Sequence, residues 1–224
     1  MIARRAVFWT LGGAAAILTA AAVAAGPVMS RVEEPEYTID TKDGAIEIRS
    51  YAPVIAAETV VQGERKAAIN EGFRRIAAYI FGDNAPREKI AMTAPVEQQR
   101  QKIAMTAPVI QQGEGEGWVI RFIMPKNWTM ESLPVPLNER VTLNPVPAHR
   151  TLVIRFSGLA GSETIEAKTA ELRRYAQEHK LTTTGEPVLA FYNPPWTLPF
   201  LRRNEIMLDL APARAAALTG PDLA

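Results

Sequence analysis

The sequence predicts an α+β protein in which two βαββ-like halves share one antiparallel sheet or barrel, with both helices on its surface. Short segments in which apolar and polar residues alternate indicate strands, and a helical period replaces this alternation in residues 64–81 and 163–179. The order strand, strand, helix, strand, strand then occurs a second time along the chain. With 224 residues, 47% of them hydrophobic, the chain can bury one sizeable core.

The first half is expected to begin with a β-hairpin. Residues 37–39 and 45–49 flank Asp43 and Gly44, a pair typical of a tight turn between strands. Ile46 and Ile48 alternate with charged residues, which indicates a half-buried strand. Residues 53–61 should continue the sheet as far as Gly63.

The first helix is predicted over residues 64–81. Ile69, Phe73, Ile76 and Ile80 are spaced four, three and four residues apart, so we expect them to share one buried face. Gly82 follows directly and is a candidate C-terminal cap, because glycine adopts the left-handed conformation that ends many helices.

The octapeptide KIAMTAPV then occurs twice, at residues 89–96 and 102–109. The spacing of 13 residues is too short for a solenoid or propeller repeat, which needs about 20 to 50 residues. Each copy ends near a proline, which favours the edge or first residue of a strand. We expect two edge-like β segments joined by a polar turn at residues 97–101, with the second copy running on into a strand at Trp118.

The first half is predicted to end with an acidic turn at residues 113–117 and a strand at residues 118–124. The proline-rich residues 133–147 are expected to connect the halves. A strand at 151–156 leads through Gly158, the counterpart of Gly63, to a helix at 163–179 with Ser162 as its N-cap. Ile165, Leu172, Tyr175 and Ala176 should face inward. Strands at 187–192 and 205–210 flank an aromatic, proline-rich loop at 193–203.

Residues 1–26 are predicted to be a targeting segment. Arg4 and Arg5 precede a 20-residue uncharged stretch at 6–25, and residues 22–24 fit an A-x-A cleavage site. A cleaved export signal and a retained membrane anchor both fit, and both place the folded part outside the cytoplasm. We therefore divide the chain into a signal or anchor at 1–30, one domain at 31–212 and a tail at 213–224.

Composition excludes several classes of function. A net charge of +1 argues against a nucleic-acid surface, which needs clustered and uncompensated cations. The chain has no cysteine, so it has no disulfide, thiolate nucleophile or cysteine zinc site. No G-x-S-x-G motif is present, and His149 and His179 are too far apart in sequence for a typical metal motif.

Four separated motifs resemble those of the SOUL haem-binding family, in its bacterial branch. They are YIFGDN at 79–84, the doubled KIAMTAPV, FYNPP at 191–195 and RRNE at 202–205. The resemblance implies a distorted antiparallel β-barrel flanked by two long helices. It also implies non-enzymatic, reversible binding of haem or another porphyrin in a shallow apolar groove between the first helix and the loop before the last strand, for carriage or buffering.

The groove suggested by this resemblance would take a flat apolar ring with two propionates, since arginines pair with carboxylates. The predicted cofactor-binding residues are Phe73, Arg74, Arg75, Ala77, Trp196, Arg202 and Arg203. From the residues alone, core aromatics and solvated arginines explain the same pattern. The metal ligand stays open between His149, His179, a methionine, a tyrosine and none, because Ser50 stands where some vertebrate members have a histidine.

Two other classes of function remain. A two-half α+β barrel resembles GyrI-like domains, which suggests a small-molecule hydrolase or an effector-binding domain for another hydrophobic ligand. Glu205, near Tyr192 and Trp196, is the candidate acidic residue for that alternative. A structural envelope protein is the third possibility, supported by the near-neutral charge and the anchor-like N-terminus. In each case the expected membrane contact is the N-terminal segment, if it is retained.

Overall fold

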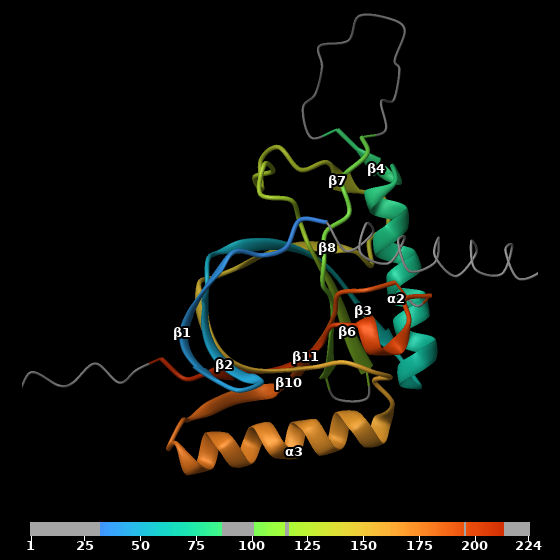
Figure 1. Ribbon diagram of the computed structural model, residues 1–224. Coiled ribbons are helices and arrows are strands. Elements are labelled where there is room, and N and C mark those ends of the chain that lie inside the picture. Colours follow the sequence, from blue (N-terminus) through green and yellow to red (C-terminus); the bar gives the residue numbers. More distant parts are fainter. Residues whose placement is uncertain (1–31, 87–100, 115–116, 195, 213–224) are drawn as a thin grey trace, which may run out of the picture.

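A computed structural model describes residues 32–86, 101–114, 117–194 and 196–212 (Figure 1). Its main feature is a nine-stranded antiparallel sheet in the order β1-β2-β9-β11-β10-β5-β6-β3-β8. The sheet curls into a half-barrel, with the helices α2 and α3 against its outer face (Figure 1). The α+β class and the barrel-like sheet are therefore as predicted.

The bounds of the elements follow. The sheet contains β1 (Tyr37–Asp43), β2 (Ile46–Tyr51), β3 (Val54–Gln62), β5 (Val109–Glu114), β6 (Gly117–Ile123), β8 (Thr142–Val146), β9 (His149–Phe156), β10 (Thr183–Phe191) and β11 (Asn204–Leu210). The helices are α2 (Arg65–Ile80), α3 (Ser162–Glu178) and the short 3-10 helix η1 (Pro199–Leu201). A separate two-stranded sheet pairs β4 (Asn84–Ala85) with β7 (Val135–Pro136).

The two predicted halves are present and meet at the centre of the sheet. The unit β3-α2-β5-β6 lies in the order β3-β6-β5, and the unit β9-α3-β10-β11 lies in the order β9-β11-β10. The strands at their adjoining ends, β5 and β10, pair with each other. Gly63 and Gly158 correspond as expected, because both have a positive φ, of 106° and 100°.

The strand that precedes each unit pairs with the other unit. β2 comes before β3 in the chain but pairs with β9, whereas β8 comes before β9 but pairs with β3. The prediction that residues 133–147 are only a connection is therefore wrong. Pro145 is tolerated in β8 because this strand lies at the edge of the sheet, where a missing N–H costs no ladder bond.

Glu64 caps the N-terminus of helix α2, because its carboxylate accepts hydrogen bonds from the backbone N–H groups of Lys66 and Ala67. It ends before Gly82, which has a φ of 119° as expected of a glycine beyond a helix. The predicted buried face is only partly correct. Ile76 and Ile80 are buried, but Phe73 is 39% exposed.

The buried ridge of α2 runs instead through Ala68 and Gly72. A Cβ atom on Gly72 would lie 2.8 Å from the Ile120 side chain of β6. The missing side chain thus allows the helix to approach the sheet closely, and this rotates Phe73 to the flank.

The first octapeptide copy, at 89–96, and most of the expected polar turn lie outside the described residues. The second copy is not a strand before Val109, so the prediction of an edge strand is wrong there. Ile103 and Thr106 are both buried while Met105 is exposed, so burial does not alternate residue by residue as it would in a strand. The copy does run on into β5 and β6 as expected, and the Ala107–Pro108 peptide is cis.

Smaller differences concern the ends of elements. β5 continues to Glu114, so the predicted turn at 113–117 is shorter than expected. Helix α3 begins at Ser162, and its N-cap is Gly161, without a side-chain cap. Leu172 and Ala176 face the sheet as predicted, with Ile165 and Tyr175 partly buried beside them.

Apolar side chains form three clusters. One lies between α2 and the strands β3 and β6, and a second between α3 and β2, β9 and β11. The third lies inside the curl and includes Tyr51, Val153, Tyr192 and Met207. Successive residues of a strand point to opposite faces, so Ile46 and Ile48 face α3 while Glu47, Arg49 and Tyr51 face the inside of the curl. The inside of the half-barrel is therefore partly charged.

Candidate functional site

The predicted residues on α2 lie on different flanks. Arg75 donates hydrogen bonds to Glu71 (2.8 Å) and to the Val60 carbonyl of β3 (3.2 Å), so it faces β3. Arg74 is exposed and pairs with Glu71 at 2.6 Å. Phe73 packs on Phe122 of β6, with 5.4 Å between ring centroids.

The flank that carries Phe73 and Ala77 faces the side of the sheet from which the aromatic loop starts. Arg65, two turns before Phe73, donates a hydrogen bond to Gln111 of β5. Its guanidinium carbon also lies 5.9 Å from the ring of Phe191, the last residue of β10. The structure therefore places Phe73 and Ala77 toward the loop, and Arg75 away from it.

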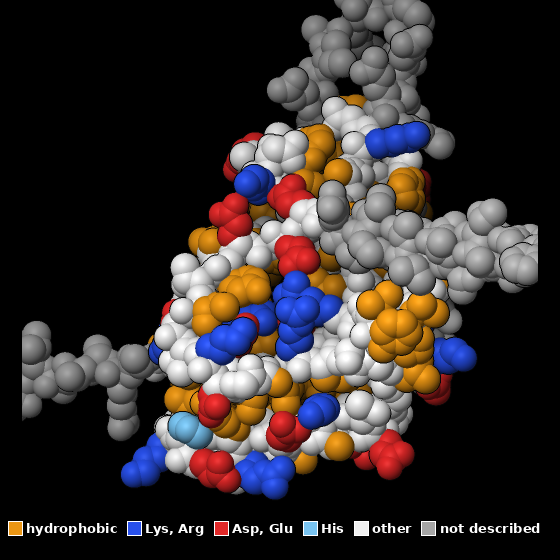
Figure 2. Space-filling view, viewed as in Figure 1, with side chains coloured by type: hydrophobic (Ala, Val, Ile, Leu, Met, Phe, Trp, Pro, Cys, Tyr) orange, Lys and Arg blue, Asp and Glu red, His pale blue; other side chains and the backbone are white. Residues whose placement is uncertain are grey.

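The loop between β10 and β11 exposes large apolar side chains. Trp196 is 65% exposed and Phe200, in η1, is 69% exposed. Figure 2 shows a group of hydrophobic side chains over η1, on the right of the view. Arg202 holds the loop in shape, because its Nε donates a hydrogen bond to the Thr197 carbonyl (2.8 Å).

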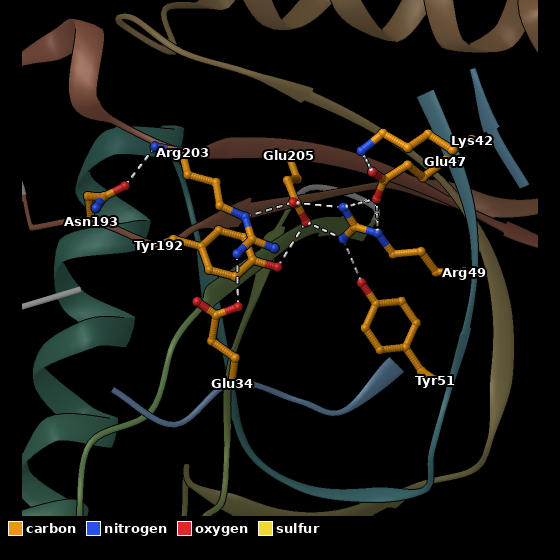
Figure 3. Close-up of polar contacts among 9 residues, drawn as sticks. All are labelled: Glu34, Lys42, Glu47, Arg49, Tyr51, Tyr192, Asn193, Arg203 and Glu205. Atoms are coloured by element: carbon orange, nitrogen blue, oxygen red, sulfur yellow. Dashed lines mark hydrogen bonds and ion pairs between the residues drawn. The ribbon is translucent and has the colours of Figure 1, made fainter. Parts of the chain in front are cut away.

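Arg203 differs from the other predicted arginines because it points into the half-barrel (Figure 3). Its Nε donates to Glu205 and its Nη1 to Glu34, both at 2.8 Å. The guanidinium carbon lies 3.7 Å above the ring of Tyr192. Its Nη2 is buried without a hydrogen-bond partner among the described residues.

The centre of this buried network is the pair Arg49 and Glu205; the sequence pointed to Glu205 as a candidate acidic residue but not to Arg49 as its partner. Arg49 donates from Nη1 to Glu205 Oε2 at 2.9 Å and from Nη2 to Oε1 at 3.1 Å. Glu47 accepts from Arg49 Nε at 2.8 Å, and Lys42 donates to Glu47 at 2.8 Å. Two strands far apart in sequence are thereby joined (Figure 3).

The network shifts the pKa of its members. Burial alone would raise the pKa of Glu205, but the hydrogen bonds and charge of Arg49, together with Arg203, hold it below its usual value. Burial raises the pKa of Tyr51 to about 12. Burial and the charge of Glu205 raise the pKa of Tyr192. Both tyrosines are therefore neutral at neutral pH. The Tyr192 hydroxyl donates to Glu205, and the Tyr51 hydroxyl accepts from Arg49 Nη1 at 3.1 Å.

Glu205 is fully occupied by these contacts. It accepts hydrogen bonds from Arg49, from Arg203 and from the Tyr192 hydroxyl (2.8 Å), so both carboxylate oxygens are used. A carboxylate with this environment and a lowered pKa is poorly suited to take up a proton from a substrate. Tyr192 lies beside Glu205 as expected, whereas Trp196 points to the surface.

A hollow of about 540 Å³ lies beside η1, between the β1–β2 hairpin and the end of β9. Four cationic side chains line it, along with aromatic and aliphatic ones; they include Lys42, Arg155, Arg202, Arg203, Phe156 and Phe200. The carboxylate among the lining residues is Glu47, which Arg49 and Lys42 already bind. We call this feature the cationic hollow. The sequence pointed to Arg202 and Arg203 but not to Lys42 and Arg155. These two residues come close to the loop only because the sheet curls.

A second hollow, the inner pocket, lies inside the curl and measures about 210 Å³. Its lining is mainly apolar and includes Tyr51, Val188, Tyr192 and Met207. A third hollow of about 630 Å³ lies next to it, where Pro35 contributes to the walls of both. Neither these two hollows nor the cationic hollow is lined by Phe73 or Trp196.

The histidines are held by backbone carbonyls. The His149 ring stacks on Tyr51 and its Nδ1 lies 3.0 Å from the Pro147 carbonyl, while Nδ1 of His179 lies 2.9 Å from the Tyr175 carbonyl. Ser50 donates to Asp40 at the surface. The described part of the chain contains no group of three or more His, Asp or Glu residues arranged to hold a metal ion. It also contains no helix that is both long and apolar enough to cross a bilayer.

A family model matches the sequence of nearly all of this folded region. The model described as "SOUL heme-binding protein" matches residues 32–209. The chain belongs to the SOUL haem-binding family. Heme-binding protein 2 of Mus musculus is 37% identical over 79 residues, which are 33% of this chain and 38% of that protein. The match thus spans well under half of that relative, and family membership supports haem or tetrapyrrole binding in general.

Solved structures share the fold of this SOUL protein at low identity. The C-terminal domain of EcmrR has a TM-score of 0.53 at 10% identity, covering 79% of this chain and 99% of that one. A hydrolase from Listeria innocua has a TM-score of 0.51 at 11% identity, covering 77% and 94%. EcmrR bound to DNA has a TM-score of 0.52 at 10% identity, covering 75% and 57%. At these identities the likeness establishes the fold alone.

Proposed function

We propose that this SOUL protein binds haem or a related tetrapyrrole reversibly, without catalysing a reaction, and carries or buffers it outside the cytoplasm. The observation that carries the proposal is the cationic hollow beside the exposed aromatic loop. Its volume of about 540 Å³ falls within the range of about 300 to 1,000 Å³ that is usual for small-molecule sites.

The lining of the hollow fits the chemistry of a flat ring with carboxylate arms. Phe156 and Phe200 offer apolar faces, and Lys42 and Arg155 are exposed cations that can pair with propionates. Trp196 extends the apolar surface along the loop. Phe73 and Ala77 lie on the neighbouring flank of α2, which supports a groove between this helix and the loop, as the family resemblance implies.

The two histidines lie far from the cationic hollow. His149 and Arg155 stand near opposite ends of the eight-residue strand β9, about 20 Å apart at 3.3 Å per residue. His179 follows the 17-residue helix α3, whose first turn adjoins the Gly158 loop. The length of the helix therefore puts His179 about 25 Å from that loop. Histidine would not ligate iron in a ring bound at the hollow, so hemin and free-base protoporphyrin should bind with similar affinity.

Titrating the protein with hemin and with protoporphyrin tests the proposal. We expect a Soret shift and quenching of tryptophan fluorescence for both ligands at micromolar concentration. Arg155→Glu should weaken binding about tenfold, or ~1.4 kcal/mol. Arg174→Glu, an exposed arginine on α3, is the matched control and should change nothing. Absence of both spectral changes would reject the function.

A second candidate function is binding of a small hydrophobic molecule in the inner pocket, as in an effector-binding domain. The observation that favours it is the apolar lining of this pocket, whose volume of about 210 Å³ is too small for a tetrapyrrole. Indole is a suitable probe. Val188→Trp should fill the pocket and abolish indole binding while leaving hemin binding intact. A hydrolase function would require turnover that Glu205→Gln removes.

A further inference from the structure

One end of the sheet presents apolar side chains that pack against no described partner on their outer side. Leu159 is 63% exposed, Trp196 65% and Phe200 69%. Two loops bring them together, because the Gly158 N–H donates to the Pro199 carbonyl (2.8 Å) and the Asn204 side chain donates to the Gly158 carbonyl (3.1 Å). We call Leu159, Trp196, Phe200 and Leu201 the loop face. Clustered exposed apolar residues of this kind mark interaction surfaces more often than scattered ones do.

Cationic side chains border the loop face. Arg155 and Lys42 lie in the adjoining cationic hollow, and Arg155 forms no ion pair with any residue of the described ranges. Glu47 is engaged by Arg49, and Glu163 at the start of α3 is the acidic residue nearest in sequence to Leu159. The border therefore carries a surplus of positive charge, which complements an anionic surface.

The chain also enters the domain next to this face. Glu34 binds Arg203, which begins the return from the loop into β11. The apolar stretch predicted at 6–25 is separated from Val32 by residues 26–31 alone. Such a link spans at most about 20 to 25 Å when fully extended. A bilayer that held this stretch would therefore lie within reach of the loop face.

We propose that the loop face docks onto an anionic lipid bilayer. Trp196 and Phe200 would enter the boundary between headgroups and acyl chains, where aromatic side chains are favoured, and Arg155 and Lys42 would contact lipid phosphates. This contact is separate from the predicted N-terminal segment and needs no bound tetrapyrrole. It shares Lys42, Arg155 and Phe200 with the proposed tetrapyrrole site, so lipid and tetrapyrrole should compete for these side chains. The cationic hollow would open beside the membrane surface.

The experiment uses the full chain with vesicles of phosphatidylcholine, with or without phosphatidylglycerol, whose acyl chains are brominated. Bromine quenches only tryptophans that enter the acyl region, so tethering by the N-terminal segment does not imitate docking of the loop. The difference between the native chain and Trp196→Phe isolates the signal of Trp196 from those of Trp9, Trp118 and Trp128. We expect at least half of the Trp196 emission to be lost on phosphatidylglycerol vesicles, and less on phosphatidylcholine alone.

Variants separate the parts of the surface. Phe200→Ser with Leu201→Ser should abolish the quenching of Trp196, and Arg155→Glu should reduce it on anionic vesicles. Leu137→Ser, an equally apolar and 54% exposed position after β7, is the matched control and should leave it unchanged. Three results would each overturn the proposal: sedimentation of the chain with vesicles while Trp196 stays unquenched, no sedimentation with vesicles at all, and burial of Trp196 in a dimer that forms without lipid. If the chain binds hemin but Trp196 is not quenched, the proposed function stands and the docking proposal is rejected.

Discussion

Arg49 and Glu205 are 156 residues apart in sequence, yet they form a two-pronged ion pair inside the half-barrel, at 2.9 and 3.1 Å. Their side chains are 1% and 0% exposed. The pair joins β2 to β11 across β9, which lies between them in the sheet. Together with Arg203 and Glu47 it satisfies most of the charge that the curl of the sheet encloses.

Glu205→Gln should destabilise the fold strongly. The variant leaves Arg49 and Arg203 buried without the carboxylate that both of them bind, and removal of one partner from a buried pair costs about 3 to 5 kcal/mol. Urea unfolding measures the loss. Glu186→Gln is the control, since Glu186 is exposed and lies 3.9 Å from Arg173, and it should change the free energy of unfolding by less than about 0.5 kcal/mol. Equal stability of the two variants would contradict the central role of the pair.

Stability should fall on the acid side of neutrality. The pKa values of Glu47 and Glu205 are lowered. Burial alone would raise both, but Arg49 and a second cation, Lys42 for Glu47 and Arg203 for Glu205, outweigh it. A carboxyl with a lower pKa in the folded state adds stability that is complete above the unfolded pKa of about 4.3. That contribution is lost as the pH falls through the folded pKa. Urea midpoints from pH 7 to pH 3 should therefore decline below about pH 5, and the decline should be shallower in Glu205→Gln.

Gly72→Ala should destabilise α2 although alanine favours helices. The new Cβ would lie 2.8 Å from the Ile120 side chain, and overpacking of this kind costs about 1 to 3 kcal/mol. Adding Ile120→Val removes the Cδ1 atom that the Cβ meets and should recover part of the loss. Gly113→Ala in β5, where the nearest atom to an added Cβ is 4.0 Å away on Trp118, should be close to neutral. Thermal unfolding of the three variants distinguishes steric overlap from a general effect of the added methyl group.

Deleting residues 97–109 should leave a folded protein. The second octapeptide belongs to the core, because Ile103 is buried and its N–H donates to the Ile80 carbonyl (2.9 Å). The deletion removes 13 residues and joins Val96 to Ile110, so an identical octapeptide stands before β5. The closure entropy changes by about 1 kcal/mol or less. Loss of cooperative unfolding in the deletion variant would show that the first copy cannot replace the second. Ile103→Ala in the full chain measures how much the buried Ile103 side chain contributes to stability.

The elements with a clear period could be predicted from sequence, and the exceptions have physical reasons. Both helices begin and end within one or two residues of the expected positions. The buried face of α2 was misjudged because Gly72 carries no hydrophobic signal, although its lack of a side chain sets the distance to Ile120. Strand β8 was missed because Pro145 suggests a loop, and only its place at the edge of the sheet makes a proline acceptable.

The site could be predicted only in part. The motif around Arg202 and Arg203 located the aromatic loop, but the local sequence does not reveal that Arg203 turns inward to Glu34 and Glu205. Glu47 and Arg49 alternate with isoleucines as surface residues of a strand would. They are buried because the sheet curls around that face, which depends on strands up to 156 residues away. The use of the seven predicted residues in binding stays a prediction.

The exchange of β2 and β8 between the two halves makes each half incomplete on its own. Separated, the first half would lack the strand that covers the edge of β3, and the second would lack the strand that covers β9. Neither half is therefore a free-standing module, despite the resemblance between them. A chain cut between β7 and β8 would give two fragments that each hold a strand the other needs, so they should reconstitute one protein when mixed and aggregate through their open edges when kept apart.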